Sequence, residues 1–289
     1  MPDQLRWRPF TLTQARAAGL SARALQGSQW RRLLRGVWAH VDVPHSRELL
    51  LAAFRLVLPA DAVICGLSAA WLYGADIRRP DDLDLHVYLP LGARIRSRDG
   101  LVVKEARLTE LDVFVYRGLK VTSGVRTIFD CLRLPSETEA VVAADALLHL
   151  RCAPVGSVAD YIACTHRVRG SRLALARLQL TEPKIESPME SRLRLLLRRA
   201  GLPLPEAQWV VRDGDRFVAR LDFAWPSVCV AIEYDGADHW GQRRQDDRRR
   251  AAARGLGWHV DVVSAEDYYA TPEDIVAMVR RALAGRGLR

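Results

Sequence analysis

The apolar and polar positions of the chain follow two kinds of pattern. Runs with an apolar residue at every second position predict strands, and runs with apolar residues three or four apart predict helices. The clearest strands are expected at 220–225 and 228–235, on either side of a Pro-Ser turn. The clearest helices are expected at 46–58 and 137–150. This mixture predicts a multidomain chain of the α/β (α+β) class.

The first 43 residues combine short helical segments with a basic hairpin. Thr11 or Thr13 can cap a first helix, and Ser21 can cap a second helix that runs to Gln26. Residues 30–41 predict two strands. This order predicts a winged helix whose second helix would enter the major groove of DNA. The alternative is a small structural domain with a solvated basic rim. The arginines that would face the phosphates are Arg23, Arg31, Arg32 and Arg35.

Residues 44–180 predict a mixed α/β middle domain. Strands are expected at 83–89, 101–104 and 112–116, and further helices at 68–74, 126–132 and 158–167. The segment after the last of these helices is the basic stretch expected to be most exposed. It is either a solvated face or a further DNA contact, and its cations are Arg167, Arg169, Arg172 and Arg177.

Short motifs in these two regions carry a family resemblance. The first motifs are Phe10-Thr-x-x-Gln14-Ala, Gly19-Leu-Ser and Leu34-Arg-Gly-Val-Trp38. They resemble the N-terminal domain of AbiEi-type antitoxins, which are winged-helix transcriptional regulators from bacterial toxin–antitoxin and phage-defence systems. Residues 69–74 and 122–130 are similar to two helices that recur in the second domain of that family. The resemblance implies DNA binding and a toxin partner.

A competing pattern lies in the same region. Gly66-Leu-Ser68 followed by Asp82-Leu-Asp84 resembles the Gly-Ser and Asp-x-Asp motifs of nucleotidyltransferases, which hold two metal ions and a triphosphate. A second glycine before the serine is missing, and no third carboxylate on a following strand is obvious. The alternative is a surface strand that is rich in aspartate.

Residues 181–289 predict a third domain that begins with a well-marked helix. Ser187 is a plausible N-cap, Pro188 suits the first helical position, and Glu190 can complete a capping box. The functional alternative is that Glu190 reaches a metal ion. The expected order of elements is helix, strand, strand, strand, helix, strand, which predicts a mixed sheet flanked by helices.

Three carboxylates are expected at one end of this sheet. Glu233 and Asp235 share a face because side chains alternate along a strand, and a hairpin would bring Asp222 beside them. Converging carboxylates repel one another unless a cation lies between them, and oxygen ligands suit a magnesium-type ion. The sequence therefore predicts that Asp222, Glu233 and Asp235 bind Mg²⁺ or Mn²⁺.

Four blocks of the last hundred residues resemble the restriction-endonuclease-like, PD-(D/E)xK domains related to very-short-patch-repair (Vsr) endonucleases. The blocks lie at 186–190, 220–226, 233–239 and 246–258. The resemblance implies phosphodiester hydrolysis, with Asp235 in place of the usual lysine. His239 is the candidate proton-transfer group, because it is the nearby side chain that titrates near neutral pH. Arg243 and Arg249 can clamp phosphates, or Arg249 can simply pair with Asp246.

Charge and cysteine content narrow the class of protein further. The 289-residue chain has a formal net charge of +9, and almost all of its cations are arginines. Such a balance is typical of proteins that neutralise nucleic-acid phosphates. The five cysteines lack CxxC spacing, which indicates neither a zinc knuckle nor a disulfide framework. No apolar run is long enough to cross a bilayer, so a cytoplasmic protein is expected.

Two functions compete on this basis. The first is a metal-dependent DNA endonuclease with a DNA-binding front end, acting in phage defence or DNA repair, with Asp222, Glu233, Asp235, His239 and Glu190 as its catalytic residues. The second is an AbiEi-type antitoxin and transcriptional regulator, whose C-terminal domain binds nucleic acid without cleaving it. Both functions require DNA as a partner.

Overall fold

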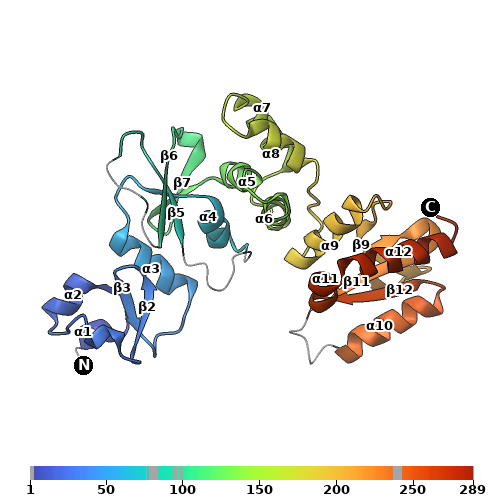
Figure 1. The fold of residues 1–289 in the computed structure, drawn as a ribbon, viewed down its shortest axis with the longest axis horizontal. Coiled ribbons are helices and arrows are strands. Elements are labelled where there is room, and N and C mark those ends of the chain that lie inside the picture. Colours follow the sequence, from blue (N-terminus) through green and yellow to red (C-terminus); the bar gives the residue numbers. More distant parts are fainter. Residues whose placement is uncertain are drawn as a thin grey trace. The chain divides into compact units, whose positions relative to one another are not determined.

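The computed structural model describes residues 3–75, 77, 84–93, 97, 100–236 and 243–288. These form helices and three sheets, one antiparallel and two with both parallel and antiparallel pairs, which confirms the predicted α/β (α+β) class (Figure 1). The chain divides into two compact units. The first comprises Met1–Cys131 with Cys152–Tyr161, and the second comprises Leu132–Arg151 with Ile162–Arg289.

The first unit begins with a small three-stranded sheet in the order β1-β3-β2. The predicted N-cap Ser21 accepts the amide of Ala24 at 3.1 Å, but the residue at the N-cap position of the next segment is Arg23. This segment is one 3-10 turn, so the expected second helix is wrong in kind. The elements of this region are α1 (Asp3–Arg6), β1 (Phe10–Thr11), α2 (Leu12–Ala17), η1 (Ala24–Gln26), β2 (Trp30–Leu34) and β3 (Val37–His40).

A five-stranded sheet in the order β6-β5-β4-β8-β7 forms the rest of the first unit. Strand β4 pairs with β5 antiparallel and with β8 parallel, and β7 lies at one edge. The elements are α3 (Arg47–Val57), β4 (Val63–Ile64), α4 (Gly66–Tyr73), β5 (Leu85–Leu89), β6 (Leu101–Glu105), η2 (Glu110–Asp112), β7 (Val113–Tyr116), β8 (Leu119–Thr122), α5 (Gly124–Leu132) and α7 (Val155–Cys164).

One hydrophobic core joins the two sheets of the first unit. Leu33 and Val37 of the β2–β3 hairpin belong to the same buried cluster as Ile64 and Val87 of the five-stranded sheet. Helix α3 lies between them and starts where predicted, because the Ser46 hydroxyl accepts the amide of Leu49. The apolar residues of these elements are therefore buried against one another without a break.

A buried polar network explains the helix motif at 122–130. The Arg126 guanidinium donates to Asp130 at 3.1 Å and to the Tyr161 hydroxyl at 3.2 Å. Tyr161 in turn donates to Asp112 at 2.6 Å, and Tyr88 donates to Asp130 at 2.8 Å. Arg126 and Asp112 are 7% and 3% exposed, so the network fixes strand β5, the turn η2 and helices α5 and α7 deep in the unit.

The second unit begins with helices that pack around a buried aspartate. Asp145 of α6 is fully buried and accepts the amide of Glu182 and the hydroxyl of Ser191, both at 2.7 Å. The Arg194 guanidinium lies 3.9 Å from it. Asp145 therefore ties α6 to the start of the C-terminal domain. The helices are α6 (Glu137–His149), α8 (Ser171–Leu178) and α9 (Pro188–Arg199).

Arg177 was expected to lie in an exposed basic stretch, but it is buried. It is 4% exposed, and its guanidinium donates to the carbonyls of Leu132, Leu134 and Pro135. It is a structural cation inside the second unit, whereas Arg167, Arg169 and Arg172 are exposed.

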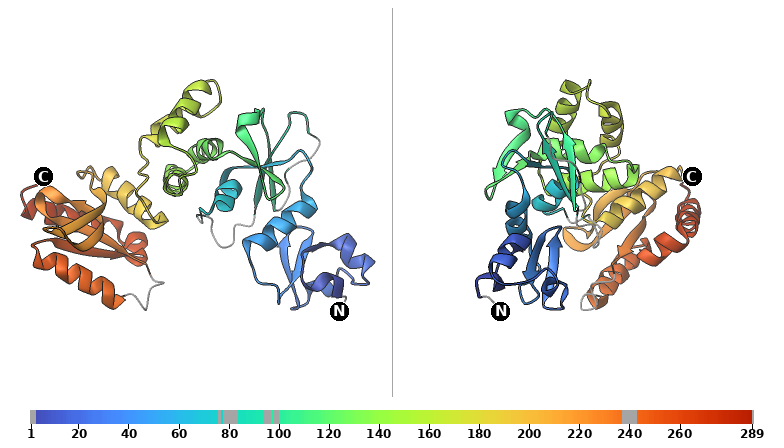
Figure 2. Two further views of the ribbon diagram at one scale, coloured as in Figure 1. Left: turned by 180° about the vertical axis from the view of Figure 1, so that it is seen from behind. Right: turned by 60° about the vertical axis from the view of Figure 1, so that its left-hand side comes forward.

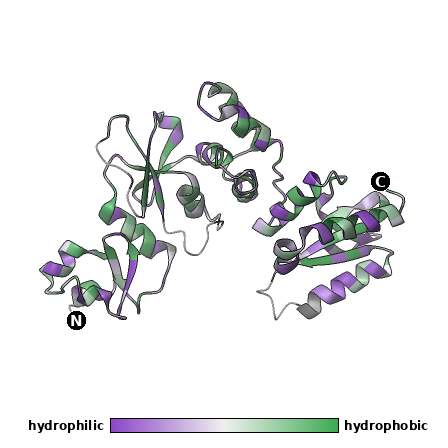
Figure 3. Cartoon of the chain, viewed as in Figure 1, coloured by the Kyte–Doolittle hydropathy of each residue, from purple (hydrophilic) through white to green (hydrophobic). Residues whose placement is uncertain are grey.

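The C-terminal sheet has the order β12-β11-β10-β9, and only the β11–β12 pair is parallel. Helix α10 packs on one face, and α9 and α12 pack on the other (Figures 1 and 2). Helix α10 is largely hydrophilic (Figure 3). The elements are β9 (Glu206–Asp213), β10 (Arg216–Trp225), η3 (Pro226–Val228), β11 (Val230–Asp235), α10 (Arg243–Gly255), β12 (His259–Ser264), α11 (Ala265–Ala270) and α12 (Pro272–Gly285).

None of the helices that the structure describes has the length and apolar character needed to span a bilayer.

The five cysteines are free, and their exposure varies. Cys65 and Cys131 are buried as expected, while Cys164 is exposed.

Candidate functional site

The N-terminal segment that contains η1 and the β2–β3 hairpin presents three of the four predicted DNA-contacting arginines to solvent. Arg23 precedes η1, Arg32 lies in β2 and Arg35 lies in the turn before β3, and all three are exposed. Arg31 differs, because it is partly buried and its guanidinium donates to the carbonyl of Val43. Arg31 therefore already has a structural role.

The predicted carboxylates of the second unit gather where β10, β11 and α9 meet. The β10–β11 ladder pairs Phe223 with Ile232. Continued by one residue, this antiparallel register places Asp222 opposite Glu233. Glu190 comes from the first turn of α9. Asp222 and Glu233 therefore lie close together just beyond the end of the ladder.

Asp222 is the electrostatic centre of this cluster. Its carboxylate accepts the backbone amide of Tyr234 at 2.9 Å, which links β10 to β11 just beyond the ladder. Burial and the negative charges of Glu190 and Glu233 together raise the pKa of Asp222 to about 7, although the Tyr234 amide lowers it. Three carboxyl groups are therefore close enough to influence one another.

Glu190 is held by contacts other than the predicted capping box. Ser187 caps α9 as expected by accepting the amide of Glu190 at 3.2 Å. The Glu190 carboxylate, however, accepts the amide of Glu186 at 3.2 Å and the side-chain amide of Gln208 at 2.9 Å. It is 6% exposed, and burial raises its pKa. Glu190 therefore connects the start of α9 to strand β9 beside Asp222.

Glu233 has a cationic partner that the sequence analysis missed. The Arg250 guanidinium of α10 donates to Glu233 at 2.6 Å, and the two residues are 9% and 4% exposed. Burial disfavours the charged guanidinium, but the hydrogen bond and charge of Glu233 outweigh this and raise the pKa of Arg250. The ion pair neutralises the carboxylate that lies opposite Asp222.

The remaining predicted site residues are Asp235, Arg249, Arg243 and His239. Asp235 ends β11 and is partly buried. Arg249 donates to Asp246 at 2.7 Å, which confirms the predicted pairing on the helix, and its charge also lowers the pKa of Asp222. Arg243 begins α10, but its side chain and the whole of His239 lie outside the described residues.

The donor set fits a divalent cation only in part. Within residues 3–75, 84–93, 100–236 and 243–288, no three histidine, cysteine, aspartate or glutamate side chains are placed to hold one metal ion. Asp222 is suited to be a ligand of such a cation, because the cation would relieve the repulsion between Asp222 and its acidic neighbours. Glu233 fits less well, because Arg250 already occupies its carboxylate.

The competing nucleotidyltransferase pattern contains a serine with a structural role. Ser68 is fully buried in α4, and its hydroxyl accepts the amide of His86 at 2.9 Å and donates to the carbonyl of Asp84 at 3.3 Å. It therefore fastens α4 to β5 and is not available to a triphosphate. Asp82 lies outside the described residues.

Comparison with known proteins places the chain in a family. Residues 62–173 match the family described as the AbiEi antitoxin C-terminal domain. Two Mycobacterium tuberculosis proteins, the uncharacterized proteins MT2308 of strain CDC 1551 / Oshkosh and Rv2248 of strain ATCC 25618 / H37Rv, are each 31% identical to the chain over 256 residues. The alignments cover 86% of this chain and 91% of each relative. The chain belongs to their family. The AbiEi-like domain thus contains the five-stranded sheet and the Arg126 network.

The crystal structure of the RV2827C protein from Mycobacterium tuberculosis is also similar. It is 16% identical, the match covers 72% of this chain and 84% of that chain, and the TM-score is 0.38. This likeness is too weak to support an argument about function.

Proposed function

We propose that the protein is a DNA-binding regulator of the AbiEi antitoxin type, with a toxin as its partner. The observation that carries this proposal is the AbiEi-like domain at 62–173, which shares one hydrophobic core with a basic N-terminal hairpin. The rigid connection would hold the arginines of the hairpin in a fixed position for DNA. The net charge of +9 favours a polyanionic partner.

The exposed arginines supply the expected contacts with the phosphates. Arg23 immediately precedes η1 and Arg32 lies in β2, and both are exposed, so they can form charge-assisted hydrogen bonds with a DNA backbone. Because the second helix of the predicted helix-turn-helix is only one 3-10 turn, the β2–β3 hairpin is the more extended candidate for DNA contact.

The proposal is tested by the salt dependence of DNA affinity, measured by fluorescence anisotropy on duplex DNA from the promoter of its own gene. The double variant Arg23→Gln/Arg32→Gln should bind more weakly, and the slope of log K against log salt should fall by about 2, or about 1 for each lost phosphate contact. The matched control is Arg216→Gln/Arg281→Gln, which removes the same charge from exposed positions of the second unit. Equal slopes in both double variants would refute the hairpin as the DNA surface.

We propose as a second candidate a metal-dependent endonuclease in the C-terminal domain. The observation that favours it is the Asp222 carboxyl, whose pKa is raised to about 7 by burial and by two neighbouring carboxylates. Perturbed carboxyl groups of this kind are frequent at functional sites. Asp222 and Asp235 would provide oxygen ligands, and Glu233 would join them only on release from Arg250. A bound Mg²⁺ ion would supply Lewis-acid assistance to phosphodiester hydrolysis.

Plasmid nicking with Mg²⁺ or Mn²⁺ separates the two candidates. The nuclease requires nicking by the wild type and by the control Asp213→Asn, whose side chain is 56% exposed on β9, but not by Asp222→Asn. Nicking by all three proteins would indicate contamination. If none of the proteins nicks the plasmid and the wild type still binds DNA in a salt-dependent way, the regulator remains as the supported candidate.

A further inference from the structure

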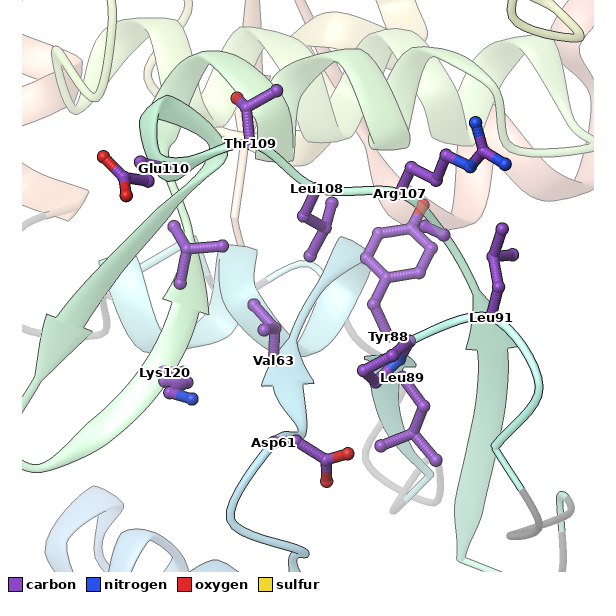
Figure 4. Close-up of a pocket in the computed structure, with 13 residues that line it drawn as sticks. Asp61, Val63, Tyr88, Leu89, Leu91, Arg107, Leu108, Thr109, Glu110 and Lys120 are labelled. Carbon is purple, nitrogen blue, oxygen red and sulfur yellow. The ribbon is translucent and has the colours of Figure 1, made fainter.

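The AbiEi-like domain contains a pocket of about 660 Å³ on one face of its five-stranded sheet (Figure 4). Val63, Tyr88 and Val113 contribute its floor from strands β4, β5 and β7. The segment from Ala106 to Glu110, which follows β6, forms the opposite wall, with Leu108 directed toward Tyr88. Pockets of about 300–1,000 Å³ with mostly apolar walls are typical of small-molecule sites.

Two walls of this pocket are fixed by the buried polar network. The Tyr88 hydroxyl donates to Asp130 at 2.8 Å, and the Arg126 guanidinium lies 4.9 Å from the centre of the Tyr88 ring. On the other wall, Asp112 accepts both the amide and the hydroxyl of Thr109, at 2.7 and 2.9 Å. The pocket is therefore preformed, and a ligand would lose little affinity to the ordering of its walls.

Charged side chains of both signs surround the apolar floor. Arg107 and Glu110 project from the two ends of the upper wall, and Asp61 and Lys120 lie below (Figure 4). All four are exposed. The cations can bind a carboxylate and the anions can bind an ammonium group, so the rim complements a molecule that carries both charges. A purely anionic ligand would meet two repelling carboxylates at the same rim.

We propose that this pocket binds a small zwitterionic molecule with an aromatic or branched apolar body, of the class of apolar dipeptides. The apolar side chains would cover Val63 and Leu108, and the termini would reach the charged rim. The inference goes beyond the proposed DNA binding and does not depend on it, because the residues that line the pocket are different from the arginines proposed to contact DNA. It makes the AbiEi-like domain a ligand-binding domain.

The test uses the full chain and the dipeptide leucyl-phenylalanine, with isothermal titration calorimetry as the readout. The wild type should bind the dipeptide with a Kd of about 1 mM or tighter, and the N-acetylated, C-amidated dipeptide about fivefold more weakly. Lys120→Glu should weaken the free dipeptide by about fivefold and leave the blocked one unchanged. The matched control Lys184→Glu changes an exposed lysine of the second unit that does not line the pocket, and it should have no effect.

A second variant, Leu108→Trp, fills the pocket and should abolish binding of both dipeptides. The proposal is overturned if the wild type shows no heat of binding at about tenfold the expected Kd, or if the blocked dipeptide binds as tightly as the free one. It is also overturned if Lys184→Glu and Lys120→Glu weaken binding equally, or if folded Leu108→Trp still binds. If Leu108→Trp does not fold, the comparison of the two lysine variants decides.

Discussion

Replacement of Asp145 by asparagine should remove a pH dependence from the stability of the second unit. Burial raises the pKa of Asp145 to about 7, although Glu182 and Ser191 donate hydrogen bonds to it. In the unfolded chain an aspartate titrates near about 3.9. Between these two values the folded protein keeps a proton that the unfolded chain has released, so the stabilisation is complete below about pH 4 and is lost as the pH rises through about 7.

The size of the effect follows from this difference. About three pH units at about 1.36 kcal/mol per unit give at most about 4 kcal/mol, of which about 3 kcal/mol should be lost between about pH 5 and pH 7. Asparagine resembles the protonated acid in shape, so Asp145→Asn should keep the contact with the Glu182 amide and lack this loss. Above about pH 7 the variant should therefore be the more stable protein.

The assay is amide hydrogen exchange in α6 and α9, corrected for the intrinsic effect of pH on exchange. The free energy of opening in the wild type, measured relative to Asp145→Asn, should fall as the pH rises. Asp213→Asn, at an exposed position of β9, should follow the wild type. Parallel pH profiles for the wild type and Asp145→Asn would refute the reasoning and would indicate that the donors around Asp145 already hold it ionised.

Two further substitutions test the packing of each unit. Arg250→Met leaves Glu233 buried without its cation, so urea denaturation should show that the free energy of unfolding falls by about 3 kcal/mol. Most of this stability should return in the double variant Glu233→Gln/Arg250→Met. An unchanged urea midpoint for Arg250→Met would show that the ion pair contributes nothing to stability. Gly124→Ala would place a Cβ atom 2.1 Å from the carbonyl oxygen of Cys152, so its melting temperature should drop by several degrees, equivalent to about 2–3 kcal/mol. Gly156→Ala has nothing within 4 Å and should be neutral or slightly stabilising, so equal melting temperatures for the two alanine variants would contradict the clash.

Local signals in the sequence predicted the starts of the helices well. The predicted N-cap Ser187 accepts an amide three residues later, and Ser46 and Ser136 do the same at the starts of the helices predicted at 46–58 and 137–150, because a cap depends only on the neighbouring backbone. Ser21 accepts the amide of Ala24 but is not the N-cap of η1. The segment between Gly19 and Gly27 is too short to stabilise an α-helix, whose first turn is costly to form.

Contacts between distant segments could not be predicted in the same way. The sequence indicated that Asp222 and Glu233 meet, because a single hairpin sets their register. The partnership of Glu233 with Arg250 depends on how α10 lies across the sheet, and one arginine among several on that helix gave no signal. The burial of Arg177 was missed for the same reason, since its acceptors lie more than forty residues away.

The shared core of the first unit has a consequence for how this protein can be divided. A cut after Val43 would separate Leu33 and Val37 from Ile64 and Val87, and it would leave two fragments whose apolar core residues are exposed to water. Deletion studies should therefore not cut between the hairpin and the five-stranded sheet, and a fragment that contains them should also keep Cys152–Tyr161, which belong to the same unit. A change in the strands of that fragment would also be transmitted mechanically to the hairpin, since close-packed interiors pass on strain rather than absorb it.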